Sequence, residues 1–98
     1  MLYAVRFVDR PDRLATRRAQ FAAHLDWLDR NRDRALVAGS LRPDPGGDPV
    51  GGLWIVEAAS RDDVEALLRT DPFWVHGLRA SHDVWHWSKA FPDRRVPV

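Results

Sequence analysis

The sequence predicts a small α+β domain in which six elements follow one another as strand, helix, strand, strand, helix, strand. Apolar residues alternate with other residues in four short stretches, as in strands, and recur at helical spacing in two further stretches. The two halves of the chain repeat the same order of elements at similar length. Because 98 residues suit one domain, we expect residues 1–98 to form a single domain with a tail at 90–98.

The first strand is predicted at Leu2 to Val8, where the side chains of both faces are mainly apolar. One face carries Tyr3, Val5 and Phe7, and the other carries Leu2, Ala4, Arg6 and Val8. Two apolar faces are typical of a strand in the centre of a sheet. After a short connection that contains Pro11, the side-chain oxygen of Asp12 is expected to cap the next helix.

A long helix is predicted from Arg13 to about Arg32, where the spacing of apolar residues becomes helical. The residues that share its apolar stripe are Leu14, Phe21, Leu25 and Leu28. At about 100° per residue, His24 lies at the border of this stripe, on the same flank as Arg17. We expect this flank to be polar and half buried, which suits a binding or catalytic site.

The middle of the chain predicts two strands, at Ala35 to Leu41 and at Gly52 to Ala58, of which the first is short and of an edge type. The later strand places Trp54 and Val56 on one face. Residues 42–52 contain three prolines and four glycines, so we expect a loop that has no strand partner, is free to move and covers a pocket.

A second helix is predicted after Ser60, which forms a capping-box pattern with Asp63. Its apolar residues are Val64, Leu67 and Leu68. Asp71 then precedes Pro72 in the arrangement of an N-cap and a first helical residue, and Gly77 can close this turn.

The last strand is predicted at Ser81 to Ser88, and the tail from Phe91 to Val98 is expected to lie over the domain or over a partner. One face of the strand carries His82, Val84 and His86, and the other carries Asp83, Trp85 and Trp87. This order of elements is ferredoxin-like βαββαβ, a four-stranded antiparallel sheet with both helices on one face. Because the other face would expose apolar side chains, we expect a second copy to cover it in a homodimer.

Composition narrows the classes of partner. The formal net charge is +1 with interleaved signs, so we expect no nucleic-acid or lipid surface as a partner. The chain has no cysteine, which excludes disulfides, thiolate catalysis and cysteine-based metal sites. No run of eighteen apolar residues and no signal-peptide pattern occurs, so we expect a cytoplasmic protein without a membrane partner.

Short segments occur in a characteristic order along the chain. These are Met1-Leu2-Tyr3-Ala4, His24-Leu25 followed by Leu28, Ala38-Gly39-Ser40-Leu41, Gly52-Leu53-Trp54-Ile55-Val56 and Asp71-Pro72-Phe73. Their order and spacing resemble those of the YCII-related (YciI-like) proteins, over nearly the whole domain to about Trp87. The resemblance implies a ferredoxin-like fold that assembles as a dimeric α+β barrel. It also implies an active-site His and Asp pair, which falls on His24 and Asp71.

The predicted pair has both a catalytic and a structural interpretation. An imidazole gains and loses a proton near neutral pH, so His24 can act as a general base or acid, with Asp71 fixing its tautomer. Alternatively, His24 is a helix-border histidine bonded to a backbone carbonyl, and Asp71 only caps the turn at Pro72. The roles of Asp71 are compatible, because one oxygen can accept from a backbone amide while the other meets His24.

Arg17 and Ser40 are predicted to bind the substrate. Arg17 can hold a carboxylate or phenolate on the flank that it shares with His24, although most helix arginines are simply solvated. Ser40 can donate a hydrogen bond but has no base beside it in sequence. His82 and His86 lie about 13 Å apart on a strand, too far to share one zinc ion, so we expect no metal site.

The favoured function is a cofactor-independent small-molecule enzyme that transfers a proton, a lyase or isomerase. The family's similarity to muconolactone isomerase-like proteins and to a dehydrochlorinase branch implies this chemistry on small ring compounds. The alternative is a non-catalytic ligand-binding or regulatory dimer that uses the same pocket. Aromatic residues on a ferredoxin-like sheet can also stack RNA bases, but the near-zero net charge and the lack of an RNP1-like run argue against RNA.

Overall fold

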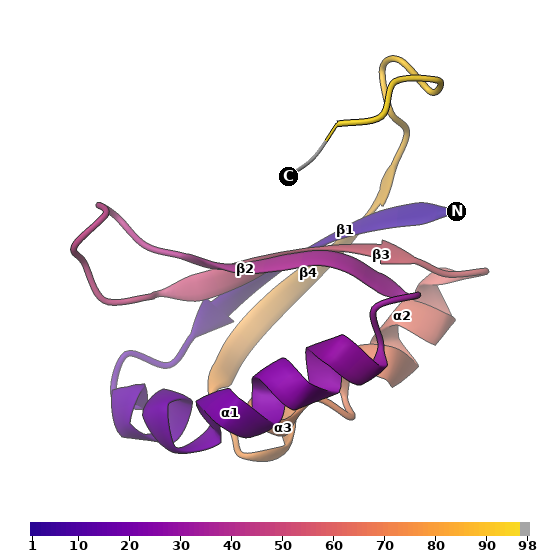
Figure 1. The fold of residues 1–98 in the computed structure, drawn as a ribbon. Coiled ribbons are helices and arrows are strands. Elements are labelled where there is room, and N and C mark those ends of the chain that lie inside the picture. Colours follow the sequence, from indigo (N-terminus) through magenta and orange to yellow (C-terminus); the bar gives the residue numbers. More distant parts are fainter. Residues whose placement is uncertain (97–98) are drawn as a thin grey trace.

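The computed structural model describes residues 1–96 and contains four strands and three helices (Figure 1). In chain order these are β1 (Leu2–Asp9), α1 (Leu14–Arg30), β2 (Ala35–Leu41), β3 (Gly51–Glu57), α2 (Arg61–Leu68), α3 (Pro72–Val75) and β4 (Arg79–Trp87). Apart from the short α3, this is the predicted order of elements.

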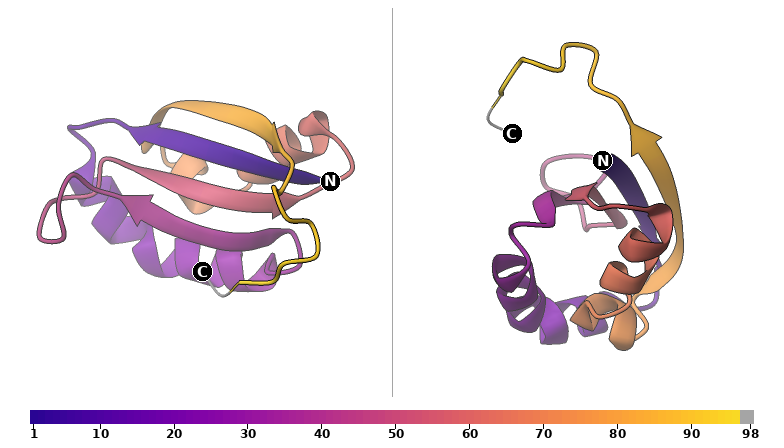
Figure 2. Two further views of the ribbon diagram at one scale, coloured as in Figure 1. Left: turned by 90° about the horizontal axis from the view of Figure 1, so that it is seen from above. Right: turned by 90° about the vertical axis from the view of Figure 1, so that its right-hand side faces the viewer.

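The four strands form one antiparallel sheet in the order β2-β3-β1-β4, which confirms the ferredoxin-like fold. Strand β1 is central, as predicted, and places Val5 opposite both Trp54 of β3 and Val84 of β4. Figure 2 shows the strands side by side and the helices on one face of the sheet. The structure therefore has two layers.

The hydrophobic core fills the space between the sheet and the helices. Buried side chains come from alternate positions of the strands and from α1 and α2, namely Tyr3, Val5, Phe7, Trp27, Trp54, Val56, Val64, Leu67, Leu68 and Val84. The core thus takes the Tyr3, Val5 and Phe7 face of β1, which the sequence left open, together with all three apolar residues predicted for α2. Each strand alternates because successive side chains point to opposite faces of the sheet.

The outer face of the sheet is apolar and exposed in the single chain. Leu53, Trp85 and Trp87 are among its exposed side chains, and 65% of Trp85 is accessible. An ion pair between Arg6 and Asp83, at 2.8 Å, crosses this face. The face that was predicted to need a cover is thus uncovered in one chain.

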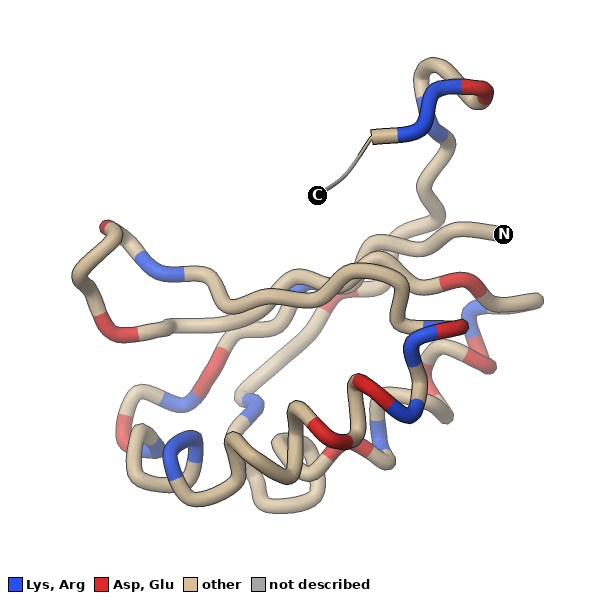
Figure 3. The backbone as a smooth tube through the Cα atoms, in the orientation of Figure 1, with Lys and Arg blue, Asp and Glu red and all other residues tan. Residues whose placement is uncertain are grey.

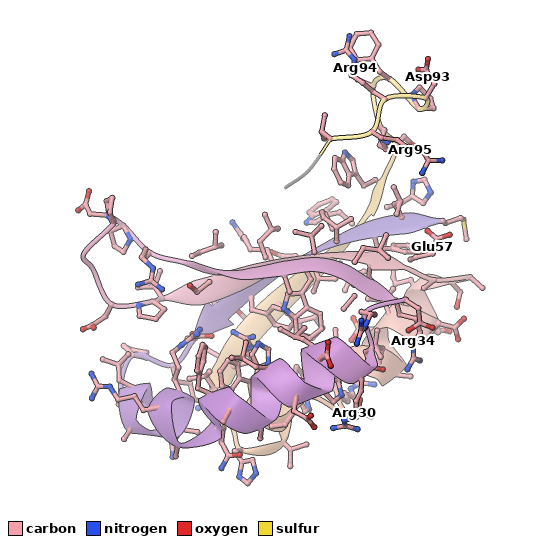
Figure 4. All side chains as sticks on the ribbon, in the orientation of Figure 1. Arg30, Arg34, Glu57, Asp93, Arg94 and Arg95 are labelled. Carbon is pink, nitrogen blue, oxygen red and sulfur yellow. The ribbon has the colours of Figure 1, made fainter. Side chains whose placement is uncertain are left out.

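The C-terminal tail leaves β4 on the side of the sheet opposite the helices (Figure 1). The labelled residues Asp93, Arg94 and Arg95 lie well away from the rest of the domain (Figure 4). Within the tail, the Arg94 guanidinium stacks on the Phe91 ring at 3.9 Å. The described part of the tail arches above the outer face of the sheet at a distance from it (Figure 2), and residues 97–98 fall outside the described residues.

Helix α1 corrects two predictions. Its N-cap is Arg13, which makes no side-chain capping bond, so Asp12 does not cap the helix. The predicted apolar stripe is not the buried face either, since Phe21 and Leu25 are 47% and 48% exposed. The buried residues are Arg17, His24 and Trp27. The physical reason is a pocket between α1 and the sheet, which Phe21 and Leu25 line.

The loop after β2 is shorter than predicted, because Gly51 and Gly52 join the ladder of β3. Gly51 lies so close to β1 that an added Cβ atom would stand 2.0 Å from the carbonyl oxygen of Phe7. Only glycine fits this approach, which explains a residue type that looked like loop in the sequence.

Charges of both signs are spread along the chain, as predicted (Figure 3). Several exposed charges pair with neighbours on the same helix, such as Asp26 with Arg30 at 3.0 Å. Within residues 1–96, no helix is both long and apolar enough to span a bilayer.

Helix α2 begins as predicted, with the Asp63 N–H donating to the Ser60 side-chain oxygen at 3.1 Å. We expect Ser60→Ala to lower the free energy of unfolding by about 1 kcal/mol, because this amide then loses its partner. Urea denaturation measures the change, with Ser60→Asp as the control that keeps a capping oxygen. Equal stability of Ser60→Ala and the wild type would show that the cap contributes nothing.

Candidate active site

The structure brings His24 and Asp71 together from segments 47 residues apart. The Nδ1 atom of His24, on α1, lies 2.7 Å from Oδ1 of Asp71, at the start of α3. Both residues are buried, with 7% of His24 and 1% of Asp71 exposed. The position of His24 is therefore explained by a specific carboxylate rather than by a backbone carbonyl.

Asp71 also caps α3, as predicted, because its Oδ1 accepts the N–H of Phe73 at 3.2 Å. Pro72 occupies the first helical position, and Gly77, with φ of 77°, closes the turn. The prediction that one oxygen of Asp71 accepts from the amide while the other meets His24 was wrong. Oδ1 meets both the amide and His24, while Oδ2 lies 4.0 Å from NH2 of Arg79.

The hydrogen bond to Asp71 determines which ring nitrogen of His24 carries the proton. Since a carboxylate only accepts hydrogen bonds, Nδ1 carries the proton in this pair, which leaves the lone pair of the neutral ring on Nε2. Nε2 has no hydrogen-bond partner among residues 1–96 and is not buried. The imidazole stacks on the Phe73 ring with centroids 3.9 Å apart and an interplanar angle of 12°, which fixes the ring plane.

His24 lines a pocket of about 230 Å³ between α1 and the β2–β3 side of the sheet. Phe21 and Leu25 of α1 form one wall, and Trp54 of β3 forms part of the other. Ser40 of β2 also lines the pocket. The pocket thus combines apolar walls with one basic nitrogen, an arrangement typical of small-molecule sites.

A buried cluster of charged residues, Asp9, Arg17 and Arg79, lies next to Asp71. The two oxygens of Asp9 bind two guanidinium groups, Arg17 at 2.5 Å and Arg79 at 2.7 Å. Arg17 also donates to the carbonyl oxygen of Gly51 at 3.3 Å. Burial lowers the pKa of Arg79 from its usual value, and the hydrogen bond and charge of Asp9 oppose that shift. All three charged residues are buried.

The cluster extends to the pair of His24 and Asp71, called the dyad below, because Arg79 lies between Asp9 and Asp71. Its guanidinium also stacks on Phe7 at 4.2 Å, and that of Arg17 lies over Phe73 at 5.0 Å. The Nε atoms of both arginines are buried without a hydrogen-bond partner in the described part of the chain. Two arginines and two aspartates balance, so a proton on His24 would leave the cluster with one positive charge.

The two predicted substrate-binding residues, Arg17 and Ser40, both line the pocket but already have partners within the protein. Arg17 lines it, but its charge is already paired with Asp9. Ser40 accepts a hydrogen bond from NH2 of Arg42 at 2.7 Å. Of the two histidines that were weighed as metal ligands, His82 pairs with Glu65 at 2.9 Å. Residues 1–96 contain no group of three His, Asp or Glu side chains that could hold a metal ion.

Sequence reasoning missed Asp9 and Arg79. A signal for them existed, since Asp9 follows the first predicted strand and Arg79 precedes the last one. These ends meet when β1 and β4 pair antiparallel, and the register does place Asp9 opposite Arg79. Opposite charges at paired strand ends would have predicted this contact.

Comparisons with known proteins agree with this architecture. The family model of the YCII-related domain matches residues 1–88. A solved structure of 5-chloro-2-hydroxyhydroquinone dehydrochlorinase (TftG) from Burkholderia phenoliruptrix AC1100, in complex with 2,5-dihydroxybenzoquinone, is 34% identical in sequence. The match covers 90% of this chain and 94% of that one, with a TM-score of 0.82.

A second solved structure is similar in fold alone. It is a putative antibiotic biosynthesis monooxygenase from Bacteriodes thetaiotaomicron VPI-5482, 17% identical over 99% of this chain and 95% of that one, with a TM-score of 0.59. No curated protein sequence gives a significant match. The family match over most of the chain, together with the ferredoxin-like sheet, places this protein in the YCII-related domain family.

Proposed function

We propose that this protein is a small-molecule lyase in which His24 transfers a proton. Asp71 orients the imidazole and stabilises it when it is protonated. The observation that carries the proposal is the 2.7 Å contact between His24 and Asp71 beside a pocket of about 230 Å³. A carboxylate on Nδ1 makes Nε2 a better base and stabilises the imidazolium that forms when Nε2 accepts a proton.

The remaining residues of the site serve this proton transfer. Asp71 cannot turn away from His24, because it is buried and also holds the Phe73 amide. The guanidinium of Arg79 lies 4.0 Å from its other oxygen. A developing negative charge on the substrate would lie beside the imidazolium, within a cluster that is neutral before the transfer. The charged groups of the site are therefore already oriented before the new charges form during the transfer.

The similarity to a dehydrochlorinase suggests a halogenated hydroxylated ring as the substrate class. In loss of HCl from such a ring, the carbon that bears chlorine first gains a proton as one hydroxyl becomes a carbonyl. Nε2 of His24 then accepts the proton of a second hydroxyl, the electrons of that O–H bond form a second carbonyl, the ring double bond shifts, and chloride leaves with its bonding pair. The balance needs no oxidant or reductant. The reaction is therefore compatible with the cofactor-independent chemistry expected from the family.

The test is chloride release from 5-chloro-2-hydroxyhydroquinone under nitrogen, compared between the wild type, His24→Ala and His82→Gln. We expect release by the wild type and by His82→Gln, whose histidine lies outside the pocket, but not by His24→Ala. Release that is unchanged in His24→Ala contradicts the proposal. Binding of the ring without release by the wild type would instead favour the ligand-binding alternative.

We also propose that two copies of the chain pair through the outer faces of their sheets. The face is apolar, and its Arg6 and Asp83 supply both charges, so it can meet its own copy across a two-fold axis. A chain of 98 residues also gains burial from a partner.

Sedimentation velocity tests the pairing. We expect the wild type to sediment as a dimer and Leu53→Glu, in the middle of the outer face, to sediment as a monomer, because two carboxylates would be buried in the interface. Val75→Glu is the matched control, since Val75 is exposed on the helical side. A monomeric wild type, or a dimer that survives Leu53→Glu, contradicts this arrangement.

A further inference from the structure

A second hollow opens from the dyad pocket. It has a volume of about 360 Å³ and lies between the first half of α1 and the loop after β2. The two hollows share Arg17, Phe21 and Ser40, so the second, the outer hollow, adjoins the first. Asp48 and Pro49 of the loop close its far side.

The outer hollow differs from the inner one in its charge. Its arginines beyond the shared residues are Arg18 and Arg42, and its one acidic residue is Asp48. No ion pair joins Arg18 or Arg42 to a carboxylate within residues 1–96. The outer hollow therefore carries excess positive charge, whereas the arginines of the inner site are neutralised by Asp9 and Asp71.

Arg42 is held in place rather than free to rotate. Its NH2 donates to the Ser40 side-chain oxygen at 2.7 Å, and its NH1 donates to the carbonyl oxygen of Gly47 at 3.2 Å. Both acceptors are uncharged, so they orient the guanidinium without neutralising it. A guanidinium fixed in this way is suited to bind a carboxylate through two parallel hydrogen bonds.

We infer that the substrate of this protein is a ring that carries an anionic group, a carboxylate, which binds Arg18 and Arg42 while the ring lies against His24. The inference rests on the proposed function. A cavity of about 150 Å³ holds benzene, so the inner pocket alone takes a single substituted ring. The outer hollow then remains for a substituent, and its charge selects an anion. Ser40 acts as a positioning residue for Arg42.

Calorimetric titration with two related rings tests this, with hydroquinone as the uncharged probe and 2,5-dihydroxybenzoate as the carboxylated one. We expect the wild type to bind the carboxylated ring at least about tenfold more tightly, because its carboxylate gains two guanidinium partners that hydroquinone cannot use. The double variant Arg18→Gln/Arg42→Gln should lose that preference while still binding hydroquinone as the wild type does.

The matched control is Arg30→Gln/Arg32→Gln, which also removes two charges, at the C-terminal end of α1, where both side chains are exposed and Arg30 lies far from the outer hollow (Figure 4). We expect this variant to keep the preference. Equal binding of both rings by the wild type, a preference that survives in the double variant, or binding of neither ring overturns the inference. Chloride release from 5-chloro-2-hydroxyhydroquinone reports on the dyad separately, because that ring carries no carboxylate.

Discussion

Replacing Asp71 with asparagine is expected to reduce kcat by about 10²–10⁴-fold with little change in KM, the range that a positioned acid–base group contributes. Asparagine keeps an oxygen that can accept the Phe73 amide, so the cap of α3 survives. What is lost is the negative charge that holds the proton on Nδ1 of His24 and stabilises the imidazolium. Removing the base itself in His24→Ala should have at least as large an effect.

Steady-state kinetics of chloride release measures both variants, and thermal unfolding measures their stability. Asp71→Asn also removes a buried charge near Arg79, so some stability is lost. The informative result is a large loss of kcat in a variant that is still folded at the assay temperature, because it separates the catalytic role from the capping role. If activity persists in Asp71→Asn, the aspartate is only a cap.

The part of this site that the sequence predicted depends on local patterns. The Asp71-Pro72 arrangement marks a helix start by itself, and the position of His24 followed from the family resemblance together with helical spacing. The contact at 2.7 Å agrees with both. The strands were predictable for a similar reason, because alternation along β1 and β3 depends only on which face meets the core.

The part of the site that could not be predicted depends on where a helix and the sheet leave a pocket between them. Helical periodicity identifies an apolar stripe, but it cannot tell whether that stripe meets the core or a pocket. Phe21 and Leu25 face the pocket, while the polar Arg17 and His24 are buried. Buried arginines are rare unless they are paired, so Arg17 was expected to be half exposed. Its burial becomes reasonable only once Asp9 is in place.

Asp9→Asn is expected to lower the free energy of unfolding by about 3–5 kcal/mol, the cost of removing one partner from a buried ion pair. The substitution keeps the shape of the side chain but leaves Arg17 and Arg79 without a charged partner at 2.5 and 2.7 Å. Domains have about 5–15 kcal/mol of stability, so this single charge accounts for a large fraction of it.

Urea denaturation of Asp9→Asn and of Asp83→Asn makes this comparison, since Asp83 also pairs with an arginine but on the outer face of the sheet. There the expected loss is less than about 1 kcal/mol, because both partners are largely solvated. Equal losses in the two variants would mean that burial of the Asp9 cluster has no special energetic role. If only Asp9→Asn is strongly destabilised, the carboxylate that sequence reasoning missed is also the group that allows Arg79 to remain buried beside Asp71 and thereby supports the dyad.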